Sequence, residues 1–283
     1  MEEHAREERQ PNDGGGDAPP RSAAFFDLDR TLMAGSSGYH FVRAAYERGM
    51  ISRRRMVGDA WDAVRFRLFG STDAGTDKVR ARLGAYIQGV PVRDLRRLAP
   101  LVLSGVLPRL YPQMLEVAYE HQDAGRAVYI CTAASQEMAG LLAYVLGFDG
   151  GIGSRSEVRD GVYTGREGGI FTYREGKAQA VRDLAGAEGI DLARSYAYSD
   201  SESDVPLLRA VGHPVAVNPD AALARIAREE GWEVLRFDRL GRRLQIAAAA
   251  LAAALAGGAG RLALRRNPVA SATPVSARRF ARR

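Results

Sequence analysis

The first apolar run of the chain, residues 23–26, is followed at once by the pattern Asp27-x-Asp29-x-Thr31. A short apolar run that ends in polar residues is typical of a buried strand whose last side chains reach a polar site. Side chains alternate along a strand, so the pattern predicts that Asp27 and Asp29 project to the same side. Two carboxylates this close repel each other unless a cation or a shared proton intervenes. The pattern therefore predicts a site for a hard, oxygen-ligated ion such as Mg²⁺, with a carboxylate left to act as nucleophile or acid–base group.

A second apolar stretch, residues 127–131, ends in Thr132 and places a hydroxyl at the exit of another predicted strand. Lys177 opens a helical stretch that runs to about Glu188. The chain has two lysines among its 40 basic residues, and the other, Lys78, is expected on a solvated helix. A compact ammonium group fits against a phosphoryl oxygen and a carboxylate where a planar guanidinium does not. We therefore expect Lys177 to bind phosphate.

A third strand, predicted over residues 195–198, runs into a group of acids that includes Asp200 and Asp204. The chain thus holds a candidate nucleophile, a hydroxyl, a lysine and metal-binding acids, which are the groups that phosphoryl transfer needs. The groups that follow strands fall at the carboxyl ends of those strands, the edge where open α/β sheets place their sites.

These motifs resemble those of the haloacid dehalogenase-like (HAD) phosphohydrolases of subfamily IB, the group that includes the phosphoserine phosphatases. The resemblance covers roughly residues 22–238 and includes two stretches typical of the subgroup, 160–165 and 211–220. Thr132 stands where Ser is commoner, and Ser199 stands where many relatives have Gly, but neither departure removes a group that the reaction needs. The motifs that carry the resemblance are Asp27-x-Asp29-x-Thr31, Thr132, Lys177 and Asp200-x-x-x-Asp204.

The resemblance implies a two-step hydrolysis of a phosphomonoester. Asp27 is then the nucleophile that forms an aspartyl-phosphate. Asp29 is the acid that protonates the leaving alkoxide and the base that later activates water. Thr132 and Lys177 are the groups that bind the nonbridging phosphoryl oxygens.

The resemblance also implies Mg²⁺ as the cofactor. Asp27, Asp200 and the backbone carbonyl of Asp29 are the implied metal ligands, and Asp204 is implied to lie near the ion through water or hydrogen bonds. Because Mg²⁺ retains several of its waters, two direct carboxylates suffice.

The sequence leaves the substrate and one rival chemistry open. A small phosphorylated metabolite of the phosphoserine kind and a phosphorylated lipid precursor both fit the motifs. A phosphotransferase that passes the same intermediate to an alcohol also fits them. A non-enzymatic, membrane-associated binding protein on the same scaffold is the further alternative, and the presence of every chemical group argues against it.

The order of apolar runs predicts an α/β fold, a doubly wound parallel sheet that is interrupted after the first strand by a helical insert. The resemblance implies that the sheet is a HAD-like Rossmannoid core and that the insert is a helical cap over the active site. The predicted parts are a disordered N-terminal arm (1–21), the catalytic core (22–35 and 126–241), the helical cap (36–125) and an Ala/Arg-rich C-terminal helix with a basic tail (242–283). Cap helices are expected over 39–46, 56–64, 77–88, 92–103 and 109–124, a hairpin over 157–163, and late strands over 215–217 and 233–237.

Residues 242–283 hold nine arginines and no acid, so that the rest of a chain with net charge +6 carries −3. The uncharged run from Leu244 to Gly260 has 17 residues, short of the ~20 that span a bilayer. Two interpretations stay open: a helix lying on an anionic membrane surface, or a helix docked on the protein body. Nucleic-acid contact is less favoured because aromatic residues are nearly absent there.

The single cysteine, Cys131, rules out an intramolecular disulfide and indicates a reducing, cytoplasmic setting, with membrane association only if the tail binds lipid. Its apolar strand predicts a buried structural thiol. The N-terminus lacks the charged-then-apolar form of a secretory signal.

Four weaker signals stay open between function and structure. Arg30 is expected either at the substrate or as an exposed guanidinium. Ser36 and Ser37 are expected to cap the first cap helix rather than to contact substrate. His213 is expected in a turn, and His121 on a cap helix.

Overall fold

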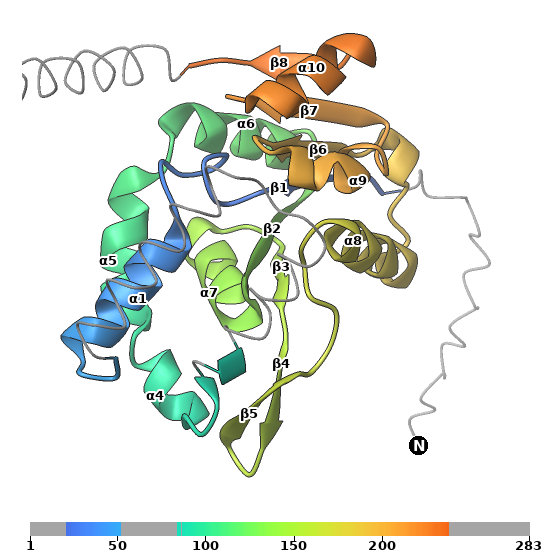
Figure 1. Ribbon diagram of the computed structural model, residues 1–283. Coiled ribbons are helices and arrows are strands. Elements are labelled where there is room, and N and C mark those ends of the chain that lie inside the picture. Colours follow the sequence, from blue (N-terminus) through green and yellow to red (C-terminus); the bar gives the residue numbers. More distant parts are fainter. Residues whose placement is uncertain (1–20, 52–83, 86, 238–283) are drawn as a thin grey trace, which may run out of the picture. The chain divides into compact units, whose positions relative to one another are not determined.

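The computed structural model describes residues 21–51, 84–85 and 87–237. Its centre is a six-stranded sheet in which every pair of neighbouring strands is parallel (Figure 1). This confirms the predicted parallel α/β sheet. The strands, in their order across the sheet, are β3 Gly150–Ser154, β2 Ala127–Ser135, β1 Ala23–Phe26, β6 Tyr196–Ser199, β7 His213–Val217 and β8 Glu233–Leu235.

Helices cover both faces of this sheet. Phe25 belongs to a buried cluster that includes apolar residues of α8, α9 and α10. Because side chains alternate along a strand, Phe26 points to the other face, where it meets His121 of α6. Tyr119 of α6 donates to the backbone oxygen of Leu146 at the end of α7, which places α7 beside α6. These helices are α6 Pro112–Asp123, α7 Gln136–Leu146, α8 Glu175–Glu188, α9 Val205–Leu208 and α10 Ala221–Glu229.

The chain changes direction across the sheet between β1 and β6. The strands β2 and β3 lie on one side of β1, and β6, β7 and β8 lie on the other. The amide of Asp27 donates to the carbonyl oxygen of Tyr198 at 2.9 Å, so pairing with β6 continues one residue past β1. Open α/β sheets bind their ligands at such a switch point, outside the carboxyl ends of the strands.

The described part of the insert forms a small helical layer. It consists of α1 Ser37–Glu47, α4 Val92–Arg96 and α5 Ala99–Val106, and the predicted helix over 39–46 is confirmed. The single helix predicted over 92–103 is wrong, because Pro100 lies in the first turn of a new helix, α5. Proline has no N–H and clashes with the preceding turn, so it is tolerated where a helix starts and not in its interior.

Other parts of the predicted insert differ in position. The helix predicted over 109–124 appears as α6, and it packs against β1 and β2 of the sheet. The helix predicted over 56–64 and most of that over 77–88 lie outside the described residues. Within the insert, α1 packs on α5 so closely that a Cβ on Gly105 would meet His40 Nδ1 at 2.2 Å.

A hairpin links the insert to the sheet. Its strands are β4 Ser156–Arg159 and β5 Val162–Glu167, joined by Asp160 and Gly161 with positive φ angles of 49° and 75°. This is the turn that the Asp-Gly pair predicts. Tyr163 pairs through its backbone with Gly89 and Val90 of the insert, at 2.9 and 3.0 Å. This pairing has no signal in the sequence, because nothing in residues 89–90 has the pattern of a strand.

Two histidines lie elsewhere than expected. His121 faces the sheet, where Arg126 Nε donates to Nδ1 at 2.6 Å, so that Nε2 carries the proton and donates to the Tyr198 hydroxyl at 2.7 Å. Burial and the charge of Arg126 lower the pKa of His121 to about 4. His213 is the first residue of β7 rather than a turn residue, and its ring stacks on Tyr196.

The chain ends are described only in part. Arg21 pairs with Ile190, whereas residues 1–20 and the predicted tail, 242–283, lie outside the described residues. The interpretations of that tail stay predictions. Among the described residues, no helix is both long enough and apolar enough to cross a membrane.

Candidate active site

A buried lysine joins two aspartates at the carboxyl edge of the sheet. The Lys177 side chain, 3% exposed, donates from Nζ to Asp27 Oδ1 at 2.8 Å and to Asp204 Oδ2 at 2.7 Å. Ser199 Oγ also donates to Asp204 Oδ2, at 2.7 Å. Burial alone would lower the pKa of Lys177, but the charges of Asp204 and Asp27 raise it well above its ordinary value. Lys177 is therefore a charged ammonium group that ties the residue after β1 to the short 3-10 helix Glu202–Asp204 that follows β6.

Asp27 is placed with one oxygen held and the other available. Its Oδ1 is bound by Lys177, and no described residue donates a hydrogen bond to Oδ2. Burial raises the pKa of Asp27 to about 7, repulsion from Asp204 and Asp29 adds to this rise, and Lys177 opposes it. The described surroundings therefore stabilise the ionised form of Asp27 only in part.

Asp29 is held by the start of the insert instead of by the sheet. Ser37 donates its amide to Asp29 Oδ1 at 2.8 Å, and Ser36 Oγ donates to Oδ2 at 3.1 Å. The prediction that Asp27 and Asp29 project to the same side assumed that both lie in one strand. The strand β1 ends at Phe26, so the alternation of side chains along a strand does not apply to Asp29. The two carboxylates are still close enough for the charge of Asp29 to raise the pKa of Asp27.

Arg30 lies in the site, where the sequence left its place open. Its guanidinium Nη2 lies 2.8 Å from Asp200 Oδ2, and the Asp200 side chain is 3% exposed. The backbone of Arg30 has a φ of 62°, a left-handed conformation that turns the chain after the aspartate pair. Burial raises the pKa of Asp200 to about 8, Arg30 opposes this, and the charges of Asp27 and Asp204 add to it.

Thr132 occupies the same edge of the sheet, inside β2 rather than after it. It is buried, and its hydroxyl accepts a hydrogen bond from the Ala134 amide at 3.2 Å. Thr172, a residue that no sequence motif marks, donates its hydroxyl to the Thr132 carbonyl oxygen at 2.6 Å. Ser154 Oγ accepts from the Thr172 amide at 3.1 Å. The loop before Lys177 is thus fastened to the end of β2.

The charges of the site favour a divalent cation. Its carboxylates outnumber its cations by two, and burial without full compensation is why the pKa values of Asp27 and Asp200 are raised. Asp204 Oδ1 is buried and has no hydrogen-bond partner among the described residues. The carboxylates are Asp27, Asp29, Asp200 and Asp204, and the cations are Lys177 and Arg30.

The described residues hold no complete cage of metal-binding side chains. Within residues 21–51, 84–85 and 87–237, no three His, Cys, Asp or Glu side chains converge as a metal-binding group. Mg²⁺ does not need one, because it binds through one or two carboxylates and keeps several waters. The donor set therefore fits Mg²⁺ and does not fit a metal that requires an all-protein cage.

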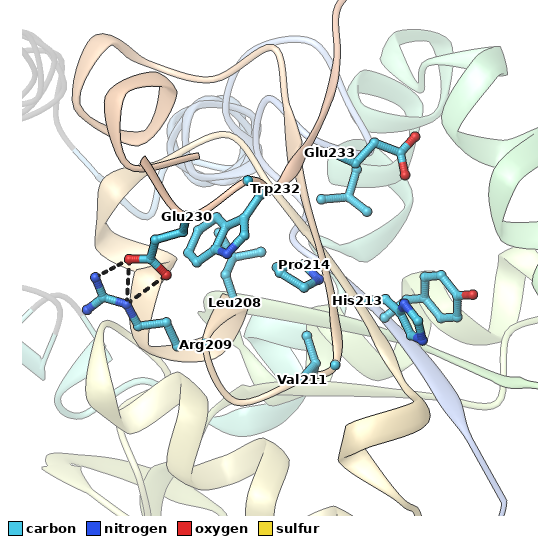
Figure 2. A pocket seen from close by; sticks show the side chains of 12 residues that line it. Leu208, Arg209, Val211, His213, Pro214, Glu230, Trp232 and Glu233 are labelled. Atoms are coloured by element: carbon cyan, nitrogen blue, oxygen red, sulfur yellow. Dashed lines mark hydrogen bonds and ion pairs between the residues drawn. The ribbon is translucent and has the colours of Figure 1, made fainter. Parts of the chain in front are cut away.

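A surface cleft of about 500 Å³ lies at the opposite edge of the sheet (Figure 2). Its lining includes Tyr196, His213 and Glu233, the first residues of β6, β7 and β8. Arg209 and Glu230, also in the lining, form an ion pair with each other (Figure 2). Parallel strands begin at this edge and end at the carboxylates, so the cleft is separate from the candidate active site.

The comparisons with known proteins show the family and the fold of this chain. A sequence profile of the haloacid dehalogenase-like hydrolases matches residues 24–209, a range that contains every candidate site residue. The chain belongs to the haloacid dehalogenase-like hydrolase family. The family membership predicted from the motifs is therefore confirmed.

Individual relatives are similar over most of their length. Phosphoserine phosphatase SerB1 of Mycobacterium tuberculosis is 40% identical over 244 residues, covering 84% of this chain and 78% of that protein. A protein of unknown function from Bordetella pertussis superposes with a TM-score of 0.68 at 31% identity, covering 76% of this chain and 98% of that one. A phosphoserine phosphatase structure with a TM-score of 0.55 and 17% identity, covering 80% and 98%, shows the shared fold alone.

Proposed function

We propose that the protein hydrolyses the phosphate monoester of a small metabolite, of the phosphoserine kind, through a phosphorylated Asp27 and with Mg²⁺ bound. The observation that carries the proposal is the state of Asp27, a buried carboxylate with Oδ1 held by Lys177 and Oδ2 left available. An anchored carboxylate with one available oxygen is positioned for in-line attack on phosphorus. The 40% identity to a protein named phosphoserine phosphatase supports the substrate class.

The first step transfers the phosphoryl group to the protein. Asp29 takes up a proton before this step. Asp27 Oδ2 then forms a bond to phosphorus as the bond to the leaving alkoxide oxygen breaks, and the protonated Asp29 gives that oxygen its proton. Lys177 and the Thr132 hydroxyl hold the phosphoryl oxygens on which charge must be stabilised.

The second step releases phosphate. Asp29, now a carboxylate, takes a proton from water, whose oxygen bonds to phosphorus while the bond to Asp27 Oδ2 breaks. Inorganic phosphate leaves, and Asp27 and Asp29 return to their starting states.

Asp27 and Asp200, with the backbone carbonyl of Asp29, are the ligands we propose for Mg²⁺, and Asp204 supports them through Lys177. The bound ion supplies positive charge beside the phosphoryl oxygens.

A panel of phosphomonoesters tests the proposed function. We expect the purified protein to release inorganic phosphate in the presence of Mg²⁺, and a chelator to abolish the release. The panel should include an aryl phosphate, phosphoserine, histidinol phosphate and glycerol phosphate, each with and without an added acceptor alcohol. Phosphoserine is expected to give the highest kcat/KM. The proposal is overturned if the protein releases phosphate from none of these substrates. Transfer of the phosphoryl group to the alcohol in place of water would identify the protein as a phosphotransferase.

The ion pair of Arg30 with Asp200 tests the proposed metal ligands. The guanidinium binds Asp200 Oδ2, so Arg30 and Mg²⁺ compete for a proposed ligand. Arg30→Ala is expected to tighten Mg²⁺ binding roughly threefold to tenfold in a calorimetric titration, because the competing charge is gone. Without metal, Arg30→Ala should melt at a lower temperature than wild type. This difference in melting temperature should disappear as Mg²⁺ saturates both proteins.

The control for this prediction is Arg159→Ala, which removes an exposed ion pair with Glu157 on the β4–β5 hairpin. It is expected to change neither the affinity for Mg²⁺ nor the response of the melting temperature to the ion. Weaker Mg²⁺ binding by Arg30→Ala would contradict the competition.

A further inference from the structure

Two residues at the start of α1 donate hydrogen bonds to the carboxylate of Asp29, the proposed acid–base group. Ser37 and Ser36 are consecutive, and each takes one oxygen of Asp29, the amide of Ser37 on Oδ1 and the hydroxyl of Ser36 on Oδ2. The chain returns to Asp29 because Gly35 turns it with a φ of 92°, a conformation that disfavours side chains. The backbone of Met33 pairs with that of Asp29 in the same turn.

Ser36 is at the N-cap position of α1 but does not act as a cap. Its backbone is extended, with φ −130° and ψ 128°, and its side chain makes no hydrogen bond to the first turn of the helix. Serine is favoured at N-caps because its oxygen accepts such a bond, which contributes typically ~1 kcal/mol. Here the hydroxyl donates to Asp29 instead, which corrects the expectation that Ser36 serves as a cap. The helix α1 therefore lacks the stabilisation that a side-chain cap supplies, and the Ser36 hydroxyl contacts Asp29 of the candidate site instead.

Two hydrogen bonds, one on each oxygen, fix the plane of a carboxyl group. The Ser37 amide can only donate, so it holds Oδ1 as an acceptor. The Ser36 hydroxyl can donate or accept, so it stays in contact with Oδ2 whether or not that oxygen carries a proton. Among the described residues, Ser36 is thus the side chain that steers Oδ2 through both steps of the reaction.

We propose that Ser36 is a positioning residue that aims Asp29 Oδ2 at the leaving oxygen of the substrate. The inference rests on the proposed function, in which Asp29 protonates that oxygen. Proton transfer by a positioned group contributes about 10²–10⁴-fold to a rate, and it depends on hydrogen-bond reach. Without Ser36 the carboxyl group keeps only the Ser37 anchor and can turn away from the substrate.

The effect must depend on the leaving group. An alkoxide leaves poorly without a proton, whereas nitrophenolate leaves as a stable anion and needs little help. If the Asp29 carboxyl group is no longer oriented toward the leaving oxygen, cleavage of alkyl phosphates therefore slows. The rate of cleavage of an aryl phosphate changes little. The constant kcat/KM reports this step, because it ends with the first irreversible departure of a product.

The test compares Ser36→Ala with wild type on para-nitrophenyl phosphate and on the best alkyl phosphate of the panel. We expect kcat/KM for the alkyl ester to fall about tenfold or more, against less than about twofold for the aryl ester. Ser36→Thr, which keeps the hydroxyl, is expected to restore most of the loss. Ser104→Ala is the matched control, because Ser104 Oγ bonds only to the Leu101 carbonyl oxygen on the exposed side of α5.

The outcomes separate this inference from the proposed function. Equal slowing of both esters by Ser36→Ala, or undiminished cleavage of the alkyl ester, overturns the positioning role. Asp29→Asn, assayed in parallel, should show the same preference for the aryl ester more strongly. If Asp29→Asn shows no such preference, or if wild type cleaves neither ester, the proposed function fails and the inference fails with it. Melting curves of both Ser36 variants should match that of wild type, because the Ser36 side chain is exposed.

Discussion

Asp27→Asn should lower kcat by at least about 10³-fold on every substrate of the panel while the protein stays folded. Asparagine keeps the shape of the side chain but cannot form the acyl phosphate, so the first step has no nucleophile. The fold should survive because Lys177 keeps its bond to Asp204 at 2.7 Å, and the variant removes a carboxylate that Asp204 and Asp29 repel. Phosphate release measures the first effect, and circular dichroism with thermal melting measures the second.

A surface aspartate supplies the control for this variant. Asp183 lies exposed on α8, where its carboxylate accepts from Gln179, and Asp183→Asn should keep wild-type rates. Substantial turnover by Asp27→Asn would rule out Asp27 as nucleophile and leave the buried carboxylate with a metal-binding role alone.

Lys177→Arg should lower kcat by about 10²-fold or more although the charge is kept. The ammonium lies in a buried space between two carboxylate oxygens at 2.8 and 2.7 Å. A planar guanidinium is larger and cannot reach both oxygens and a phosphoryl group from one point. Overpacking a buried site also costs ~1–3 kcal/mol, so urea unfolding should show a lower midpoint.

The chain supplies its own control in its second lysine. Lys78→Arg makes the same chemical change at a position that lies outside the described residues and outside the motifs, and it should leave the rate unaltered. Lys177→Ala goes further than the arginine variant, because it leaves two buried carboxylates without their cation, a change that costs ~3–5 kcal/mol. Normal rates for Lys177→Arg would mean that the position needs only positive charge.

The parts of the site that follow strands were predictable from the sequence. An apolar run that ends in a polar residue is a local pattern, and it located Asp27 and Asp200 just past the ends of β1 and β6. The same pattern found Thr132 at this edge of the sheet, although β2 continues past it to Ser135. Lys177 was predicted from its place among the ordered motifs, and the rarity of lysine in this chain supported the prediction. The roles of all four in catalysis stay proposals that the variants above test.

The parts that depend on loop conformation were not predictable. The ion pair of Arg30 with Asp200 needs a left-handed backbone at Arg30, and a residue that is not glycine gives no sequence signal for this. The contact of Ser36 with Asp29 needs a turn at Gly35, and the sequence favoured a cap because caps are the commoner role for serine. Thr172 was missed because a hydroxyl that binds a distant carbonyl oxygen has no pattern of its own.

The central position of β1 has a consequence for how the protein is made. β1 is synthesised early, but its neighbour β6 begins at Tyr196, and the bond from Lys177 to Asp27 closes a separation of 150 residues. Until β6 emerges from the ribosome, one edge of an apolar strand has no partner, and such edges pair with other chains. A chain that stops before β6 would carry Asp27, the proposed nucleophile, and Lys177 but neither Asp200 nor Asp204. The proposed site can therefore assemble only in chains that extend past Asp204, and shorter chains leave an apolar strand edge open to pairing with other chains.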